Sequence, residues 1–380
     1  MYNRILKLPL ENSSSIFLFG PRGTGKTSWI KEHLPAALYL DLLDFATYSS
    51  LSANPNRLEN LIPENYKDWV VIDEVQRVPE LLNEVHMLIE GRKIKFLLTG
   101  SSARSLRRHG VNLLAGRSLT YNMHPLIIQE MPNDFDMQHV LQFGLLPASI
   151  HHADPKRYLE SYVQTYLREE VMQEGLTRNI GAFSRFLEVA SFSQAQILNM
   201  SEIARELSLN RLTVTQYFEI LEDLLLATRI SAFTKRAKRK VIAHQKFYFF
   251  DVGVYKTLRP MGPLDTPEEA DGAGLETLFL QSLSAVNDYY DLKYKIYFWR
   301  THAGQEVDFV LYGPRGLHAF EIKRSATLTN KAFSGLKSFH EDYPEAKLTL
   351  LFFGKHKEYH GNITAIPFQE ALSNLPELLS

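Results

Sequence analysis

The chain of 380 residues contains no cysteine. This absence excludes disulfides and thiolate metal ligands, and it fits the reducing cytoplasm in which we expect the protein to reside. No apolar run is long enough to cross a membrane, and the N-terminus lacks the apolar stretch of a signal peptide, so we expect no membrane association. The net charge of −1 gives no overall attraction to nucleic acid. Any binding to nucleic acid must therefore come from local patches.

The chain is rich enough in apolar residues to build more than one core. Hydrophobic residues make up 45% of it and charged residues 22%, which is typical of globular proteins. A chain of 380 residues is too long for a single core and suggests two or three domains.

One segment has the pattern of a phosphate-binding loop. Residues 16–19 are apolar, residues 20–27 read GPRGTGKT, and the residues that follow can continue as a helix. In this order, backbone N–H groups and the helix N-terminus surround the phosphates. Lys26 is expected to contact the β- and γ-phosphates of ATP, and Thr27 to hold Mg²⁺. The predicted nucleotide-binding residues are Gly20, Pro21, Arg22, Gly23, Thr24, Gly25, Lys26, Thr27, Ser28 and Asp73.

A buried strand that ends in two carboxylates is predicted downstream. The apolar run Trp69–Ile72 is typical of a strand in a parallel sheet, and Asp73 and Glu74 follow it directly. This places both carboxylates at the edge where ligands of such sheets bind. We predict that Asp73 positions Mg²⁺ and that Glu74 is the catalytic base. A solvated turn is the alternative, and the upstream glycine loop argues against it.

The middle of the chain predicts a helical region and a basic hairpin. Residues 132–175 have a helical pattern, in which Asp154-Pro155 caps and begins a helix. A helix-turn-helix over 201–225 and a hairpin of Thr228–Phe233 with Lys246–Phe250 together indicate a winged helix. We predict that five cations at the hairpin tip contact DNA phosphates: Lys235, Arg236, Lys238, Arg239 and Lys240. A solvated basic loop and a protein-binding helix-turn-helix are the alternatives.

The last third of the chain predicts a separate α/β domain. Residues 259–273 indicate a linker, and a helix from about Leu275 and three strands follow. Two carboxylates and a lysine on adjacent strands can hold Mg²⁺ and activate water for attack on a phosphodiester. The candidate nuclease residues are Glu276, Asp308, Glu321 and Lys323, with Asp308 and Glu321 as the metal ligands. The alternative is a nuclease-like fold that does not cleave.

Together the motifs resemble a widespread family of bacterial and archaeal AAA-type ATPases. Its members end in a domain of unknown function that looks like a PD-(D/E)xK nuclease. The resemblance covers nearly the whole chain and rests on GPRGTGKT at Gly20–Thr27, DEVQRVPEL at Asp73–Leu81, LLTGSS at Leu97–Ser102, LAGR at Leu114–Arg117, KFYFFDVGV at Lys246–Val254, EVDFV at Glu306–Val310 and EIKRS at Glu321–Ser325.

The resemblance implies an α/β fold in several parts. These are an AAA-type P-loop core with a parallel sheet at residues 1–131, a helical lid plus winged helix-turn-helix at 132–258, the linker at 259–273, and a restriction-endonuclease-like α/β domain at 274–380. One departure from the family pattern is Gly23-Thr24, where Gln-Val is more usual. We expect both residues to face the exterior of the loop.

The resemblance also implies further catalytic residues. AAA-type ATPases place a polar residue between the two Walker motifs to sense the γ-phosphate, which indicates Thr99 or Ser101 here; simple turn chemistry is the alternative. Arg104, Arg107 and Arg108 follow on a predicted helix. An arginine at the next helix-to-strand junction commonly reaches a neighbouring subunit's nucleotide, which indicates Arg117. A surface role for Arg117 is equally compatible with the sequence. We therefore expect a homo-oligomer, for which a hexamer is one form.

We predict an ATP hydrolase that uses ATP and Mg²⁺ and acts on DNA. Hydrolysis would be coupled to DNA binding or remodelling, with a tethered nuclease-like domain. The alternative is a nucleotide-gated binding switch that engages a protein partner, with a catalytically silent C-terminal domain. Glu74 favours turnover, because a pure switch needs no general base.

Overall fold

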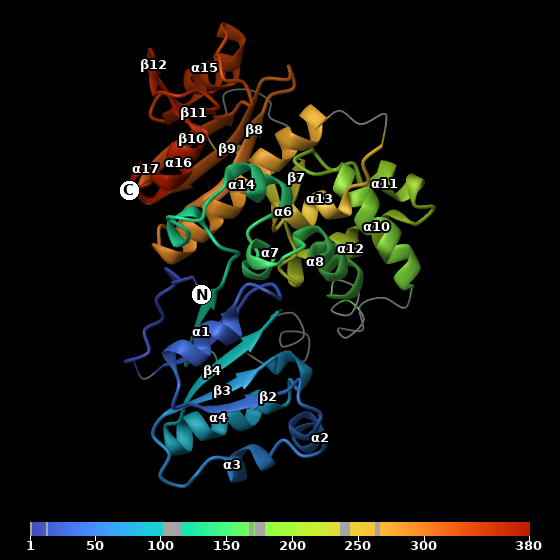
Figure 1. Ribbon diagram of the computed structural model, residues 1–380, viewed down its shortest axis with the longest axis vertical. Helices are drawn as coiled ribbons and strands as arrows, with labels where there is room; N and C mark the ends of the chain where they lie inside the picture. The colour runs from blue at the N-terminus through green and yellow to red at the C-terminus, as the bar shows by residue number, and fades with distance from the viewer. Residues whose placement is uncertain are drawn as a thin grey trace. The chain divides into compact units, whose positions relative to one another are not determined.

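The computed structural model describes residues 2–12, 14–101, 114, 116–166, 171, 179–235, 244–262 and 267–380. The chain separates into two compact units. Arg4–His124 make up most of the smaller unit, and Pro125–Glu222 with Leu226–Ser380 make up most of the larger one. Figure 1 shows the elements of each unit.

The smaller unit is built on a five-stranded sheet with the strand order β2-β3-β4-β1-β5. All four pairings are parallel. The carboxyl ends of the strands therefore meet at one edge, where β1 and β3 flank β4. The strands are β1 (Ser15–Phe19), β2 (Leu38–Asp41), β3 (Trp69–Asp73), β4 (Lys95–Gly100) and β5 (Ser118–Asn122).

The apolar runs of this sheet form its core. Both β1 and β3 are buried along their whole length, as the continuous apolar runs at 16–19 and 69–72 predict. Phe17, Ile72 and Leu98 belong to one hydrophobic cluster that also contains residues of the helix α4. The helices of this unit are α1 (Lys26–His33), α2 (Phe45–Ala53), α3 (Arg57–Leu61), the 3₁₀ turn η1 (Val75–Arg77) and α4 (Leu81–Arg92).

The first half of the larger unit is helical. The predicted cap of α8 is present, because the Asp154 side chain accepts a hydrogen bond from the backbone N–H of Arg157. Both helices of the predicted helix-turn-helix are formed, and Asn199 caps the first of them. The elements are η2 (Ile128–Glu130), α6 (Met137–Phe143), α7 (Pro147–His151), α8 (Pro155–Ser161), the π-helical turn η3 (Tyr162–Tyr166), α10 (Ile180–Phe192), α11 (Met200–Glu206) and α12 (Arg211–Asp223).

An eight-stranded mixed sheet runs through the rest of the larger unit in the order β12-β13-β11-β10-β9-β8-β6-β7. The predicted hairpin is formed by β6 and β7, but β6 also pairs in parallel with β8. The hairpin is therefore one end of the C-terminal sheet, which the sequence did not indicate. The strands are β6 (Ala227–Ala232), β7 (Gln245–Phe249), β8 (Lys295–Arg300), β9 (Glu306–Gly313), β10 (Gly316–Ile322), β11 (Lys347–Phe352), β12 (Glu358–His360) and β13 (Ile363–Pro367).

The long helix α14 begins earlier than predicted. It starts at Pro267, inside the segment 259–273 that the sequence indicated as a linker, and proline suits the first turn of a helix. The remaining helices are α13 (Val252–Leu258), α14 (Pro267–Tyr289), the 3₁₀ turn η4 (Asn330–Phe333), α15 (Ser334–Asp342), α16 (Phe368–Ser373) and α17 (Leu375–Leu378). Among the described residues, no helix combines the length and apolar character that a membrane span requires.

Candidate functional site

The glycine loop between β1 and α1 depends on glycine at three positions. Gly23 and Gly25 have φ values of 85° and 96°, in the left-handed region that favours glycine. At Gly20, an added Cβ would lie only 2.3 Å from the backbone oxygen of Met123. The backbone of this loop therefore requires glycine at the positions from which the loop was predicted.

Lys26 and Thr24 turn into this loop. Lys26 is buried, and its Nζ donates to the backbone oxygens of Gly20 and Pro21 at 2.6 and 3.2 Å. Thr24 is also buried, and its Oγ1 donates to the backbone oxygen of Pro21 at 2.9 Å. The expectation that Thr24 faces outward is therefore wrong, because the tight turn brings its hydroxyl back to Pro21. Gly23 is exposed, as expected.

Asp73 is the meeting point of three hydroxyl groups. It is 4% exposed and accepts hydrogen bonds from Thr27 Oγ1 at 3.0 Å, from Thr99 Oγ1 and from the Tyr39 hydroxyl. Thr99 is the last but one residue of β4, between the strands that carry the other two motifs. The structure thus brings three predicted residues together: Thr27, Asp73 and Thr99. Two other residues predicted to bind the nucleotide, Arg22 and Ser28, are half-buried and exposed, respectively.

Tyr39 is a member of this group that the sequence analysis missed. It lies on β2, in register with Val71 of the neighbouring strand β3. Burial and the negative charge of Asp73 raise the pKa of Tyr39 above its usual value, so the hydroxyl remains a hydrogen-bond donor. Tyrosine is common in strands, so nothing in the sequence marked Tyr39 as a site residue. Only the order of the strands in the sheet shows that its hydroxyl reaches Asp73.

Glu74 is held by a second network. Its backbone has a φ of 58°, an uncommon value for a residue with a side chain, and its N–H donates to Thr99 Oγ1 at 3.3 Å. Gln76 Nε2 donates to Glu74 Oε2 and, at 3.1 Å, to Ser101 Oγ. Ser101 therefore reaches the predicted base through Gln76, a residue that the sequence analysis did not select.

Arg117 lies just before β5, at the predicted junction. Its Nε makes an ion pair with Glu90 of α4, and both side chains are substantially exposed. Exposed pairs of this kind add little stability. Arg104, Arg107 and Arg108 lie outside the described residues.

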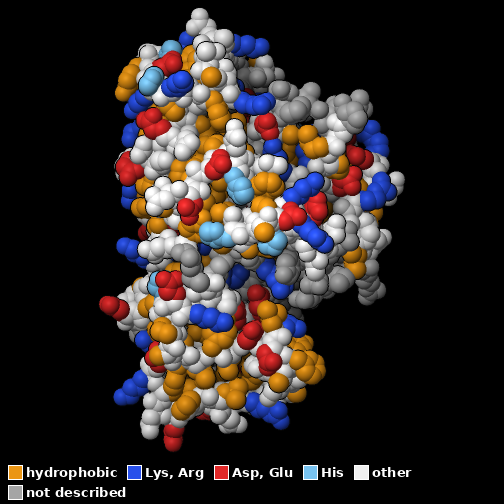
Figure 2. Space-filling model, in the orientation of Figure 1, with side chains coloured by type: hydrophobic (Ala, Val, Ile, Leu, Met, Phe, Trp, Pro, Cys, Tyr) orange, Lys and Arg blue, Asp and Glu red, His pale blue; other side chains and the backbone are white. Residues whose placement is uncertain are grey.

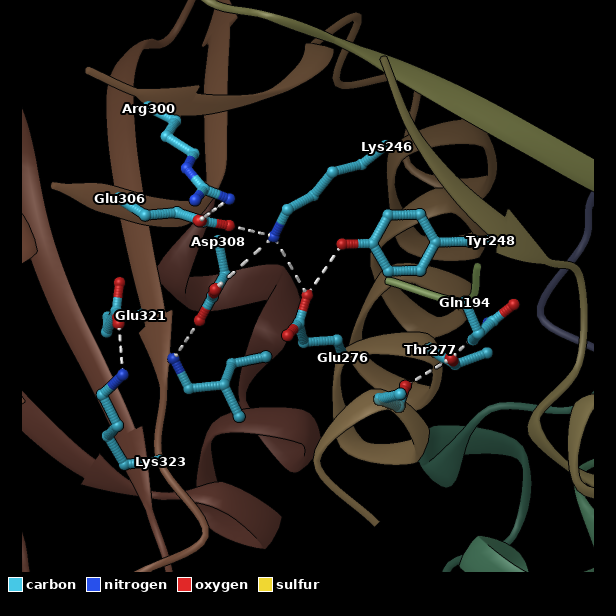
Figure 3. A network of polar contacts seen from close by, with 12 residues as sticks. Gln194, Lys246, Tyr248, Glu276, Thr277, Arg300, Glu306, Asp308, Glu321 and Lys323 are labelled. Atoms are coloured by element: carbon cyan, nitrogen blue, oxygen red, sulfur yellow. Dashed lines mark hydrogen bonds and ion pairs between the residues drawn. The ribbon is translucent and has the colours of Figure 1, made fainter. Parts of the chain in front are cut away.

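A second group of ionisable residues lies in the larger unit, and we call it the carboxylate–lysine cluster. Helix α14 and strands β7 to β10 contribute its members, which converge in Figure 3. It contains every candidate nuclease residue as well as three residues that were not selected from the sequence. The members are Lys246, Glu276, Arg300, Glu306, Asp308, Glu321 and Lys323.

Lys246 is the buried cation of this cluster. Its Nζ makes an ion pair with Glu306 and lies 3.6 Å from Glu276 and 3.9 Å from Asp308. Burial alone would lower the pKa of Lys246, but the three carboxylates outweigh it and raise the pKa above its usual value. Tyr248, on the same face of β7, donates to Glu276 at 2.8 Å.

Asp308 and Glu321 have different surroundings. Asp308 Oδ2 accepts a hydrogen bond from the backbone N–H of Ile322 at 2.8 Å. Glu321 pairs with Lys323 through Oε1, whereas its Oε2 is buried without a hydrogen-bond partner among the described residues. Burial and the charge of Asp308 raise the pKa of Glu321 well above its usual value. Glu306, Glu321 and Lys323 also line a cavity of about 560 Å³.

The arrangement of the cluster bears on the predicted metal ligands. Within the described part of the chain, no group of three or more histidine, aspartate and glutamate side chains is arranged to hold a metal ion. The ammonium of Lys246 lies among the carboxylates of Glu276, Glu306 and Asp308. A divalent ion at Asp308 and Glu321 thus stays a prediction, and it would have to compete with this lysine.

Only one of the predicted DNA-contacting cations can be placed. Lys235 is exposed, and its Nζ lies 4.0 Å from the centroid of the Tyr312 ring. Arg236, Lys238, Arg239 and Lys240 lie outside the described residues.

Three parts of the chain match known sequence families. Residues 12–132 match a family described as "AAA domain". Residues 12–132 form an AAA-type P-loop domain. This domain contains the glycine loop, Asp73, Glu74, Thr99 and Arg117. Residues 134–265 and 271–371 match two domains of unknown function, DUF8612 and DUF4143.

The chain is also similar over nearly its whole length to two mycobacterial proteins. Uncharacterized proteins of Mycobacterium bovis and Mycobacterium tuberculosis are each 23% identical to it over 387 aligned residues. The alignments cover 99% of this chain and 85% of each relative.

The similar solved structures are distant. The Aeropyrum pernix ORC1 protein, solved in complex with DNA, covers 64% of this chain and 86% of its own at 13% identity and a TM-score of 0.27. A Vibrio cholerae protein covers 97% of both chains at 12% identity and a TM-score of 0.23. A STAND signal-transduction ATPase from Pyrococcus horikoshii covers 74% and 46% at 14% identity and a TM-score of 0.21.

Proposed function

We propose that the protein is an Mg²⁺-dependent ATPase that acts on DNA. The observation that carries this proposal is the convergence of Thr27 and Thr99 on Asp73, with Glu74 next in the chain. A hydroxyl and a carboxylate 3.0 Å apart suit the octahedral oxygen shell of Mg²⁺, so Thr27 and Asp73 would hold the ion. The bound ion would neutralise charge on the β- and γ-phosphate oxygens.

The remaining residues of the domain have separate tasks in this proposal. Lys26 would bind phosphate oxygens in place of the two backbone oxygens that it now contacts. Glu74 would accept a proton from the attacking water, which requires its carboxylate to be held in position. Gln76 supplies that restraint, and it links Glu74 to Ser101. A binding switch without turnover needs no general base, so it would not need Gln76 to hold Glu74 in position.

We propose assembly into a homo-oligomer, in which Arg117 completes a neighbouring nucleotide site. Large apolar side chains are exposed on the smaller unit, and Phe45 at the start of α2 is 79% exposed. Leu43, Leu61 and Met87 are each exposed by more than 40%. Figure 2 shows hydrophobic side chains gathered on the surface around α2 and α3. Such a patch on a globular protein commonly marks an interface, which supports contact between copies.

The proposed DNA contact rests on the basic segment between β6 and β7. The segment carries five cations in six residues, Lys235 to Lys240, and no acidic residue. Several cations in a row can neutralise adjacent phosphates without reading sequence. We further propose that residues 274–380 form a tethered nuclease-like domain.

One experiment tests the proposed function. Oligomer size and ATPase rate are measured together on the intact chain, with and without duplex, single-stranded and branched DNA. We expect Mg²⁺-dependent hydrolysis that at least one DNA form stimulates, and a higher oligomer when ATP is bound. Nucleotide binding with no turnover on any DNA form would contradict the proposal and would favour a nucleotide-gated switch.

A further inference from the structure

The carboxylate–lysine cluster holds more charge than packing alone requires. Four carboxylates face three cations within it (Figure 3). The four carboxylates come from α14, β9 and β10. Lys246 is central, because its Nζ lies within 3.9 Å of carboxylate oxygens of three residues. Arg300 and Lys323 lie at the two ends of the cluster, against Glu306 and Glu321.

Lys246 reaches the cluster from a part of the sequence outside the predicted nuclease-like domain. It lies on β7, and its side chain is only 3% exposed. Burying an ammonium group is costly unless carboxylates surround it closely, and here they do. Tyr248 binds Glu276 from the same face of the strand. Strand β7 therefore supplies both a cation and a hydrogen-bond donor to the carboxylates.

We propose that Lys246 is an internal counter-cation that takes the place of a divalent ion and keeps the cluster from binding one. A metal such as Mg²⁺ or Mn²⁺ needs carboxylate oxygens that converge to about 2.1 Å from one point. The ammonium of Lys246, between Glu276 and Asp308, prevents their oxygens from converging in this way. The positive charge that offsets the cost of burying these carboxylates therefore comes from Lys246 and not from a metal ion.

Glu321 lies on the side of the cluster that borders a cavity. Its Oε2 is buried without a hydrogen-bond partner among the described residues, and Glu321 lines the cavity of about 560 Å³. An ion that entered this cavity would meet the carboxylates of Glu306 and Glu321 and the ammonium of Lys323. Ligation by Asp308 as well requires Lys246 to leave. This inference goes beyond the proposed ATPase function, because it does not depend on nucleotide hydrolysis.

Manganese titration of the intact chain without nucleotide tests the inference. The double variant Lys246→Met/Glu306→Gln removes one cation and one carboxylate, so the net charge of the cluster stays the same. We expect it to bind Mn²⁺ at least tenfold more tightly than the wild type. Glu306→Gln alone retains Lys246 and should show no gain in affinity. Addition of Asp308→Asn to the double variant should abolish the gain. Any Mn²⁺ that binds at Asp73 is common to all variants and does not affect the comparison.

Two outcomes would overturn the inference. One is a folded double variant that binds Mn²⁺ no more tightly than the wild type. The other is a gain in affinity that survives Asp308→Asn. If the double variant is unfolded in buffer, thermal unfolding is followed as Mn²⁺ is added. Recovery of the wild-type transition supports the replacement of Lys246 by the metal, and no recovery at saturating Mn²⁺ contradicts it.

Discussion

Gln76 donates a hydrogen bond through Nε2 to the carboxylate of Glu74, two residues before it in the chain. Gly100 leaves the space for this contact, because an added Cβ there would lie 2.2 Å from Gln76 Oε1. We expect Gln76→Leu to lower kcat about tenfold with little change in KM, since the base is present but less well oriented. Gly100→Ala should give the same pattern by displacing Gln76. A rise in KM alone in either variant would mean that Gln76 acts on nucleotide binding.

Lys26 and Glu74 should separate nucleotide binding from hydrolysis. Lys26→Ala removes contacts to the bound phosphates, so we expect loss of nucleotide binding in a fluorescent-nucleotide titration. Glu74→Gln should bind ATP normally but hydrolyse it about 10²- to 10⁴-fold more slowly, because only the attacking water is affected. Glu80→Gln, an exposed position before α4, is the matched control and should be fully active. Wild-type hydrolysis by Glu74→Gln would reject Glu74 as the base.

Arg117 should be needed for hydrolysis but not for ATP binding. We expect Arg117→Ala to slow turnover by about 10³-fold, as for arginines that stabilise a transferred phosphoryl group. Mixing it with Glu74→Gln subunits should restore part of the activity, because one kind of mixed interface carries both groups. Glu90→Ala removes the ion-pair partner and should leave activity unchanged. No rescue in subunits shown to co-assemble would assign Arg117 a structural role.

The basic segment should control DNA affinity and its dependence on salt. We expect alanine at its five cations to weaken binding and to flatten the slope of log affinity against log salt by about 0.9 for each lost phosphate contact. The substituted residues are Lys235, Arg236, Lys238, Arg239 and Lys240. Lys355→Ala/Lys357→Ala, at exposed positions of the same unit, provides the comparison. An unchanged slope would remove this segment from the DNA contact.

His318 should make the larger unit sensitive to mild acid. Its imidazole is buried and lies 3.0 Å from the Tyr294 hydroxyl, and burial lowers its pKa from 6.5 to about 4. The unfolded chain takes up a proton below pH 6.5, whereas the folded chain does so only near pH 4. Stability from this residue is therefore complete above pH 6.5 and is lost as the pH falls towards 4.

The expected loss for His318 is about 2–3 kcal/mol, measured by urea unfolding between pH 7.5 and 4.5. The variant His318→Gln should lack this part of the pH dependence. His356→Gln, at an exposed position, should retain it. Equal pH dependence of the wild type and His318→Gln would contradict the assignment.

The sequence predicted those parts of the site in which neighbours in the chain are neighbours in space. The glycine loop and the pair Asp73-Glu74 each lie within a few residues, so their spacing carried the information. Thr99 was indicated, together with Ser101, by the resemblance to AAA-type ATPases. Tyr39 and Lys246 were missed, because their partners lie on other strands and, for Lys246, also on the helix α14. Alternation in a strand shows which residues share a face, but it does not show which strand lies alongside.

The same limit explains why the sequence predicted the hairpin of β6 and β7 but not its place in the larger sheet. Its two strands and their turn are local, and the sequence predicted them. The pairing of Ser231 with Tyr297 joins segments that are distant in the chain, on either side of a predicted domain boundary. The early start of α14 had a local signal in Pro267, but the acidic and glycine-rich composition around it favoured a linker.

The pairing of β6 with β8 also affects how the chain is made. A ribosome releases β6 and β7 before α14 and β8 have been synthesised, so the edge of β6 that later pairs with β8 emerges unpaired. Exposed strand edges invite pairing with other chains. Lys246 emerges at the same stage, before any of the carboxylates that later enclose it. Until those carboxylates arrive, burial of this ammonium group against an apolar surface is costly.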